Sequence, residues 1–175
     1  MAIKDARGNL HSEETGRFIE KSAEERLEEA RAICDSDQSS RYLRMEHLRQ
    51  LIEHSGAPDQ MLHNLIRQGF VNLTIKRGLQ DKHIEGTRNY RQEIAAGRHP
   101  SILTADPATL VKKLAGTGVP IMDRSGNWVM REAVRSDVGI GFSVDSSGKR
   151  AHTRNATIHY ANEGTHIVPR KETKK

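Results

Sequence analysis

Two histidines near the end of the chain have the spacing and surroundings needed for proton transfer. His159 and His166 lie seven positions apart in the segment IHYANEGTHIVP, on either side of an Asn-Glu-Gly turn signal. Histidine is the side chain whose ordinary pKa lies nearest physiological pH, so a pair can supply both a base and an acid. The surrounding segment is rich in Lys and Arg, which suits an anionic substrate such as a phosphodiester.

The register of this predicted hairpin decides whether the histidines meet. With a two-residue loop at Glu163-Gly164, His159 opposes Val168 and Ala161 opposes His166, so both histidines share one face. A four-residue loop pairs the histidines directly, and a three-residue loop places them on opposite faces. The alternative to a catalytic pair is two surface histidines on a small sheet.

A second candidate segment is DKHIEGT, residues 81–87. It places Lys82 and His83 directly before a predicted helix whose N-cap is Thr87. Free backbone amides at a helix start bind anions readily, and the two side chains can add positive charge. The alternative is an ordinary capped loop.

Other motifs exclude several kinds of enzyme. The run AGTG, residues 115–118, lies at a helix C-terminus, so it is a cap and turn rather than a nucleotide-binding loop. Glu132 stands next to Arg131 and near Arg135, and we expect it to satisfy their charge. The absence of HExxH and GxSxG disfavours metalloproteases and serine hydrolases. Cys34 is the only cysteine, which excludes internal disulfides and disfavours a cysteine-based zinc site.

The positive charge is concentrated in the second half of the chain. Residues 1–80 hold 12 Lys and Arg against 13 Asp and Glu, whereas residues 81–175 hold 16 against 10. A basic half suggests an anionic partner, with nucleic acid the first choice. The alternative is a solvated surface with a basic tail. No run of 18 apolar residues predicts a transmembrane helix, and the N-terminus does not resemble a secretory signal.

Periodicity and capping signals predict helices first and strands afterwards. The expected helices cover residues 22–34, 41–54, 58–68, 87–96 and 106–114. The expected strands cover residues 120–122, 128–134, 138–144, 155–160 and 165–168. This order indicates an α+β fold, in which an N-terminal helical segment precedes a small domain with two helices packed on a roughly four-stranded antiparallel sheet. We divide the chain into a flexible lead (1–20), a helical adaptor or delivery-protein remnant (21–78), a functional domain (79–170) and a basic tail (171–175).

A series of short motifs resembles a known family over residues 80–170. The motifs are DKHIEGTRNY, GRHPSIL, AGTG, REAV, IGFSV, SSGKRAHTRNATIHY and EGTHIVP, in that order. Together they resemble the polymorphic toxin type 50 domain, found at the C-termini of bacterial contact-dependent and phage-associated toxins. The resemblance implies a ribonuclease of the barnase–EndoU–colicin–RelE-like fold. It also directs attention to particular positions, which are His83, Thr87, Ser101, Thr153, His159, Tyr160 and His166. Ala161 departs from the pattern, since relatives usually carry Ser after His-Tyr.

These observations predict a metal-independent endoribonuclease toxin with no cofactor. His159 and His166 are the expected acid and base, and His83 is the next candidate. Lys82 and Arg154 are expected to stabilise charge. Thr153 and Tyr160, and through the resemblance Thr87 and Ser101, are expected to contact substrate.

The expected partners follow from this hypothesis. They are RNA as substrate, an acidic immunity protein, and a delivery or phage capsid protein bound through the N-terminal helices. The expected site of action is the cytoplasm of the target or host bacterium, reached by other delivery machinery. Two alternatives remain open. One is a non-catalytic nucleic-acid-binding or phage structural protein, and the other is a metal site built from His83, His159 and His166.

Overall fold

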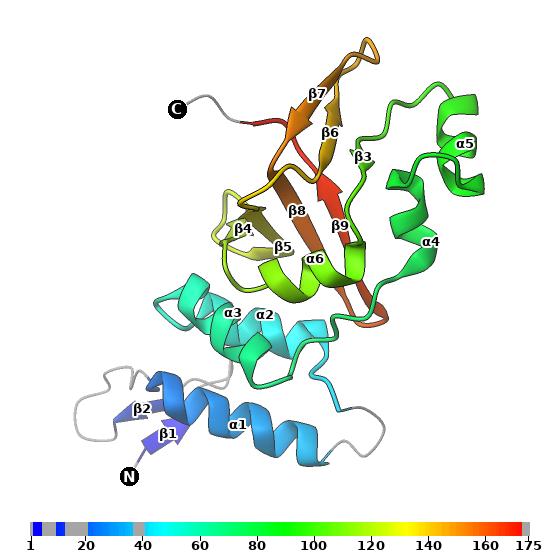
Figure 1. Ribbon diagram of the computed structural model, residues 1–175. Coiled ribbons are helices and arrows are strands. Elements are labelled where there is room, and N and C mark those ends of the chain that lie inside the picture. The colour runs from blue at the N-terminus through cyan, green and yellow to red at the C-terminus, as the bar shows by residue number, and fades with distance from the viewer. Residues whose placement is uncertain (1, 5–9, 13–20, 37–40, 173–175) are drawn as a thin grey trace.

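The structure is a computed structural model that describes residues 2–4, 10–12, 21–36 and 41–172 (Figure 1). Its helices are α1 (Ala23–Ser36), α2 (Met45–Glu53), α3 (Pro58–Arg67), α4 (Arg77–Gln80), the 3-10 helix η1 (Asp81–His83), α5 (Arg88–Ala95) and α6 (Pro107–Leu114). Its strands are β1 (Ala2–Lys4), β2 (Leu10–Ser12), β3 (Ile102–Leu103), β4 (Val119–Met122), β5 (Trp128–Arg135), β6 (Gly141–Val144), β7 (Arg150–Thr153), β8 (Asn155–Ala161) and β9 (Gly164–Pro169). The expected lead and tail lie partly outside the described residues.

The α+β class predicted from the sequence is confirmed, but the strands after residue 100 divide between two antiparallel sheets. One sheet has four strands in the order β4-β5-β8-β9, and the other has three in the order β3-β6-β7. Strand β6 pairs with β3 because Gly141 (φ 150°) brings the two backbones together. A Cβ atom at Gly141 would lie 2.0 Å from the carbonyl oxygen of Ile102, so a larger residue would block this pairing.

Helices α2 and α3 share one hydrophobic core with the four-stranded sheet. Most of their apolar side chains are buried, and the same core contains side chains from β5, β8 and β9. Large apolar residues at 2% exposure or less contribute from both sides, including Leu48, Ile52, Met61, Leu62 and Leu65 on the helices, and Trp128, Ile158 and Ile167 on the sheet. The expected boundary near residue 78 therefore falls between segments that pack together, and we propose that the folded domain begins before α2.

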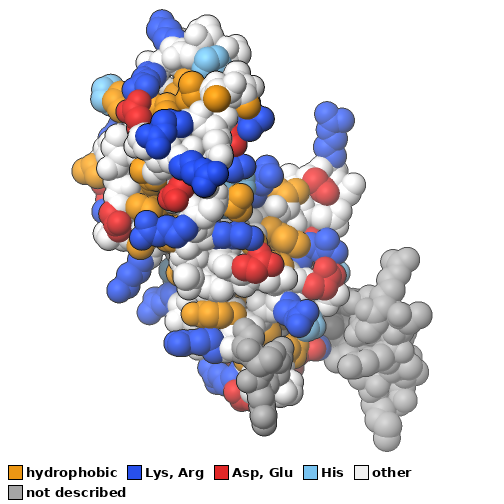
Figure 2. Space-filling view, turned by 90° about the vertical axis from the view of Figure 1, so that its right-hand side faces the viewer, with side chains coloured by type: hydrophobic (Ala, Val, Ile, Leu, Met, Phe, Trp, Pro, Cys, Tyr) orange, Lys and Arg blue, Asp and Glu red, His pale blue; other side chains and the backbone are white. Residues whose placement is uncertain are grey.

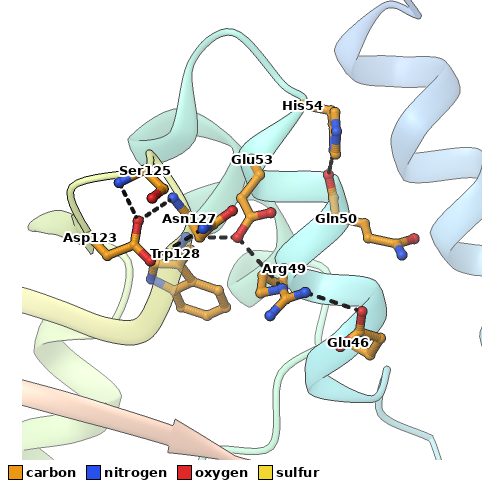
Figure 3. Close-up of polar contacts among 9 residues, drawn as sticks. All are labelled: Glu46, Arg49, Gln50, Glu53, His54, Asp123, Ser125, Asn127 and Trp128. Atoms are coloured by element: carbon orange, nitrogen blue, oxygen red, sulfur yellow. Dashed lines mark hydrogen bonds and ion pairs between the residues drawn. The ribbon is translucent and has the colours of Figure 1, made fainter. Parts of the chain in front are cut away.

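Polar contacts join α2 to the β4–β5 turn (Figure 3). The Glu53 carboxylate accepts a hydrogen bond of 2.7 Å from the backbone N–H of Trp128, and its Oε1 lies 3.6 Å from Nε of Arg49. Asp123 accepts hydrogen bonds from the backbone N–H groups of Ser125 and Asn127, which closes the turn. The carboxylate of α2 thus satisfies the backbone at the first residue of β5.

The segment between α3 and α4 covers the outer edge of β9. Thr165 donates its N–H to the Thr74 carbonyl at 2.7 Å and accepts the N–H of Lys76 at 2.8 Å. The Gln80 side chain then pairs with both backbone groups of Ile167, at 2.8 and 3.0 Å. Residues 70–75 thus contribute one parallel bridge, Ile75 with Thr165, and lead the chain to α4 and η1 beside the sheet.

Candidate active site

The β8–β9 hairpin pairs His159 directly with His166. Its two-residue turn lies at Asn162-Glu163, one position earlier than the turn expected at Glu163-Gly164. Tertiary contacts hold this register, because the Asn162 side chain accepts the N–H of Met45 at 2.8 Å. The two imidazole rings stack with their centroids 4.5 Å apart and their planes inclined by 26°.

Arg131 extends this pair into a row across three neighbouring strands. It opposes His159 in the β5–β8 ladder, as His159 opposes His166 in the β8–β9 ladder. Residues directly opposite in antiparallel strands project from the same face. We call these three residues the Arg131–His159–His166 row. The row occupies the sheet face opposite the core, since the neighbouring Ile158 and Ile167 are fully buried.

A distortion of β5 sets the position of Arg131. Met130 has a φ of 57°, which makes it the sole non-glycine residue with positive φ in the described part of the chain. Such a backbone costs roughly 1–2 kcal/mol for an L-residue. The register against β4 shifts at this point, and the indole N–H of Trp128 donates to the Arg131 carbonyl at 2.9 Å. The bulge turns Trp128 into the core while Arg131 joins β8 in the row.

His83 approaches the row from η1. Its Nδ1 lies 2.9 Å from the carbonyl oxygen of Ser101. A carbonyl oxygen can only accept, so Nδ1 carries the hydrogen and Nε2 of the neutral ring is free to accept a proton. Burial lowers the pKa of His83, while the bond to Ser101 and the charge of Glu93 act in the opposite direction.

The electrostatic surroundings keep the paired histidines neutral. Burial, followed by His166, Arg131 and His83, lowers the pKa of His159 to about 4. Burial, followed by His83, Arg131, Lys76 and Lys82, lowers the pKa of His166 to about 4. Neither ring is hydrogen-bonded to another residue that the structure describes, so the ring nitrogens of both can contact a substrate. Arg131 likewise has no carboxylate within 4 Å among the described side chains. The row therefore suits an anionic group.

The lowered pKa values predict that acid destabilises the fold. Histidines of the unfolded chain titrate near 6.5, so between about pH 6.5 and 4 the unfolded chain binds more protons than the folded chain. The free energy of unfolding should be highest above pH 6.5 and decrease as the pH falls towards 4. The double variant His159→Asn, His166→Asn should show a smaller decrease of Tm over this range. Thermal unfolding at a series of pH values measures it, with the exposed His54→Asn as control, and equal slopes would contradict the prediction.

The structure does not bring Tyr160 or Glu132 to the row. The Tyr160 hydroxyl donates to the buried Glu132 carboxylate on the core side of the sheet, and burial, then Glu132, raises the pKa of Tyr160 well above its usual value. Glu132 also accepts the N–H groups of Gly116 at 2.9 Å and Gly118 at 2.6 Å. The expectation that Glu132 satisfies the neighbouring arginines is wrong, because strand alternation turns adjacent side chains to opposite faces.

Of the other residues predicted to contact substrate, Lys82 lies near the row, whereas Thr87 and Ser101 hold the local structure around it. Lys82 lies close enough to lower the pKa of His166, and its Nζ is 3.4 Å from Glu93. Thr87 is the expected N-cap of α5, because its hydroxyl accepts the N–H of Tyr90. Ser101 acts through its carbonyl oxygen on His83.

Thr153 and Arg154 lie away from the row. The buried Thr153 hydroxyl donates to the carbonyl of Arg170 at 2.7 Å, so it is occupied within the fold. Arg154 precedes β8, five positions before His159, which at roughly 3.3 Å per residue separates their backbones by about 16 Å. Its exposed guanidinium lies 3.9 Å from Glu172. Ala161, by contrast, lies on the row's face of β8, two positions beyond His159.

The sequence interpretation missed Arg131 as a site residue. The available signal was strand alternation, which places Arg131 and Glu132 on opposite faces and leaves the arginine without its expected partner. No group of three or more His, Cys, Asp or Glu is arranged to hold a metal ion in the described segments. In the same segments, no helix is both long and apolar enough to cross a bilayer.

Comparison with known families identifies the segment that contains this site. Residues 75–169 match the sequence model of the family described as bacterial toxin 50, which is more than half of the 175 residues. The match includes the row, His83 and Lys82, whereas α1, α2 and α3 lie outside it. Comparison with curated proteins gave no match.

Proposed function

The chain belongs to the bacterial toxin 50 family, and we propose that its toxic activity is metal-independent cleavage of RNA at the Arg131–His159–His166 row. The observation that carries this proposal is the stacked histidine pair beside an arginine that has no acidic partner among the described residues. Two imidazoles 4.5 Å apart can serve two oxygens of one phosphodiester, and the cation can hold its charge.

The proposed reaction is attack by the ribose 2′-hydroxyl on the adjacent phosphorus. One neutral imidazole accepts the hydroxyl proton as the bond between the 2′-oxygen and phosphorus forms. A protonated imidazole donates to the 5′-oxygen as the bond between phosphorus and that oxygen breaks. The products are a 2′,3′-cyclic phosphate and a 5′-hydroxyl. Arg131, with Lys82 nearby, stabilises the charge on the phosphoryl oxygens.

Without substrate, the site holds neutral histidines that can act as a base, but no protonated histidine that can act as the acid. With a pKa of about 4, both His159 and His166 are neutral near pH 7, so either ring can act as base. A bound phosphate brings negative charge to the row, which favours the protonated form of a neighbouring histidine. The general acid therefore acquires its proton together with the substrate. His83, whose Nε2 is free to accept a proton, is the second candidate for the base.

Cleavage of total RNA in EDTA tests the proposed function. We expect fragments that carry a 2′,3′-cyclic phosphate and a 5′-hydroxyl, because the proposed mechanism uses no metal. Gel electrophoresis and end mapping measure the products, and the His159→Ala, His166→Ala double variant controls for contaminating nuclease. Intact RNA under all conditions, with the protein still binding it, would support the alternative of a non-catalytic nucleic-acid-binding protein. Cleavage lost in EDTA and restored by a divalent metal would contradict the metal-independent mechanism.

The proposed function implies two protein partners. A toxin that cleaves cellular RNA endangers its producer, so we propose an immunity protein with acidic residues that complement the positive surroundings of the row. We also retain the proposal of a delivery or phage partner that binds the N-terminal helices. For this partner the exposed side of α1 is the available surface, because α2 and α3 use their apolar stripes within the fold.

A further inference from the structure

An aromatic pair on the three-stranded sheet has no part in the proposed chemistry. Phe142 on β6 and His152 on β7 oppose each other, with ring centroids 4.3 Å apart and planes inclined by 42°. Phe142 is half-buried, whereas His152 is exposed on the outer strand of the sheet. The phenyl ring supports one side of the imidazole, and the rest of the imidazole remains open to solvent.

Cationic side chains lie next to this pair. Lys149 lies in the β6–β7 turn, and Arg150 is two positions before His152 on β7; both are exposed. Nη2 of Arg150 lies 2.6 Å from Glu85, whereas Lys149 has no carboxylate within 4 Å in the described part of the chain. Figure 2 shows histidine and hydrophobic side chains among Lys and Arg over the upper part of the molecule, where Figure 1 places β6, β7 and α5.

Strand β3 connects the pair to the candidate active site. Ser101, which binds His83 through its carbonyl, immediately precedes β3, and Ile102 of β3 opposes Phe142. Neighbouring strands lie about 4.8 Å apart, so β7 with His152 is roughly 10 Å from β3. His152 therefore lies two strands away from the strand that follows Ser101, the residue that positions His83.

We propose that His152, supported by Phe142 and flanked by Lys149 and Arg150, stacks on a base of single-stranded RNA whose backbone is cleaved at the Arg131–His159–His166 row. This inference rests on the proposed function, because it takes RNA as the substrate. An exposed ring beside cations is the combination that single-strand-binding surfaces use, in which rings hold bases and cations follow the backbone. Every base has a face that can stack, so this subsite contributes affinity more than base preference.

Binding of a short single-stranded 2′-O-methyl RNA tests the subsite without turnover, since this strand lacks the attacking hydroxyl. His152→Ala should weaken its binding roughly 5- to 100-fold, and Phe142→Leu should weaken it to a smaller extent. His152→Trp should restore binding, whereas His152→Lys should not, because the lysine retains positive charge but has no ring. His54→Ala is the matched exposed-histidine control, and affinity for an abasic strand of equal length should not change with His152→Ala.

A kinetic measurement with cleavable RNA gives a second readout. His152→Ala should raise KM with little change in kcat, because stacking away from the reacting phosphate binds ground state and transition state equally. Unchanged affinity of His152→Ala, or full rescue by His152→Lys, would overturn the stacking subsite while leaving the proposed catalysis intact. Failure of the unaltered protein to bind any single-stranded RNA would instead overturn the proposed function.

Discussion

Replacing His159 or His166 with alanine is expected to lower the rate of RNA cleavage roughly 10²–10⁴-fold, the usual contribution of general acid or base catalysis. Each replacement leaves one imidazole without its counterpart, so one of the two proton transfers loses its catalyst. Both side chains lie on the face opposite the core, and the variants should therefore remain folded. Single-turnover cleavage of a defined RNA at several pH values measures the effect.

The two losses should not add, because the two rings act as a unit. The double variant should be about as slow as the slower single variant, and the bell-shaped pH profile expected of the unaltered protein should be lost. His54→Ala, which changes an exposed histidine directly after α2, should cleave at the normal rate. Near-normal cleavage by the double variant would refute the assignment and direct attention to His83 and Lys82, or to charge stabilisation by Arg131 alone.

A fragment that begins at residue 80 is expected not to fold, although it contains every residue of the proposed site. Removing α2 and α3 would expose core side chains of the sheet such as Ile158 and Trp128, which are 0% and 1% exposed in the intact chain. It would also remove the Glu53 carboxylate from the Trp128 backbone. Circular dichroism and the fluorescence of Trp128, the single tryptophan, measure this loss.

The matched control for this deletion is a fragment that begins at residue 21, which retains α1 to α6 and should unfold cooperatively. A point variant gives an independent measurement, since Leu48→Ala in the intact chain should lower the free energy of unfolding by about 2–5 kcal/mol. A fragment of residues 80–175 with a cooperative thermal transition and native tryptophan emission would disprove the shared core. The family match begins at residue 75, so its boundary alone would suggest the shorter and, on this argument, incomplete domain.

Local signals in the sequence determined the type and order of most elements. Ser22 and Glu25 form a reciprocal capping box before α1, and Asp106 accepts the N–H of Thr109 at the start of α6. Such caps depend on residues three positions apart, so the sequence alone contains the necessary information. Strand alternation predicted, in the same way, that His159 lies on the opposite face from Tyr160.

Long-range contacts decided the features that complete the candidate site. The hairpin register depends on Asn162 meeting Met45, whose positions are 117 apart in the chain. Arg131 joins the histidines because Met130 adopts a positive φ, a conformation that its residue type disfavours and the surrounding contacts maintain. The division into two sheets and the shared core with α2 and α3 likewise depend on which buried surfaces meet. A sequence pattern shows that a surface must be buried, but only the tertiary structure decides which partner buries it.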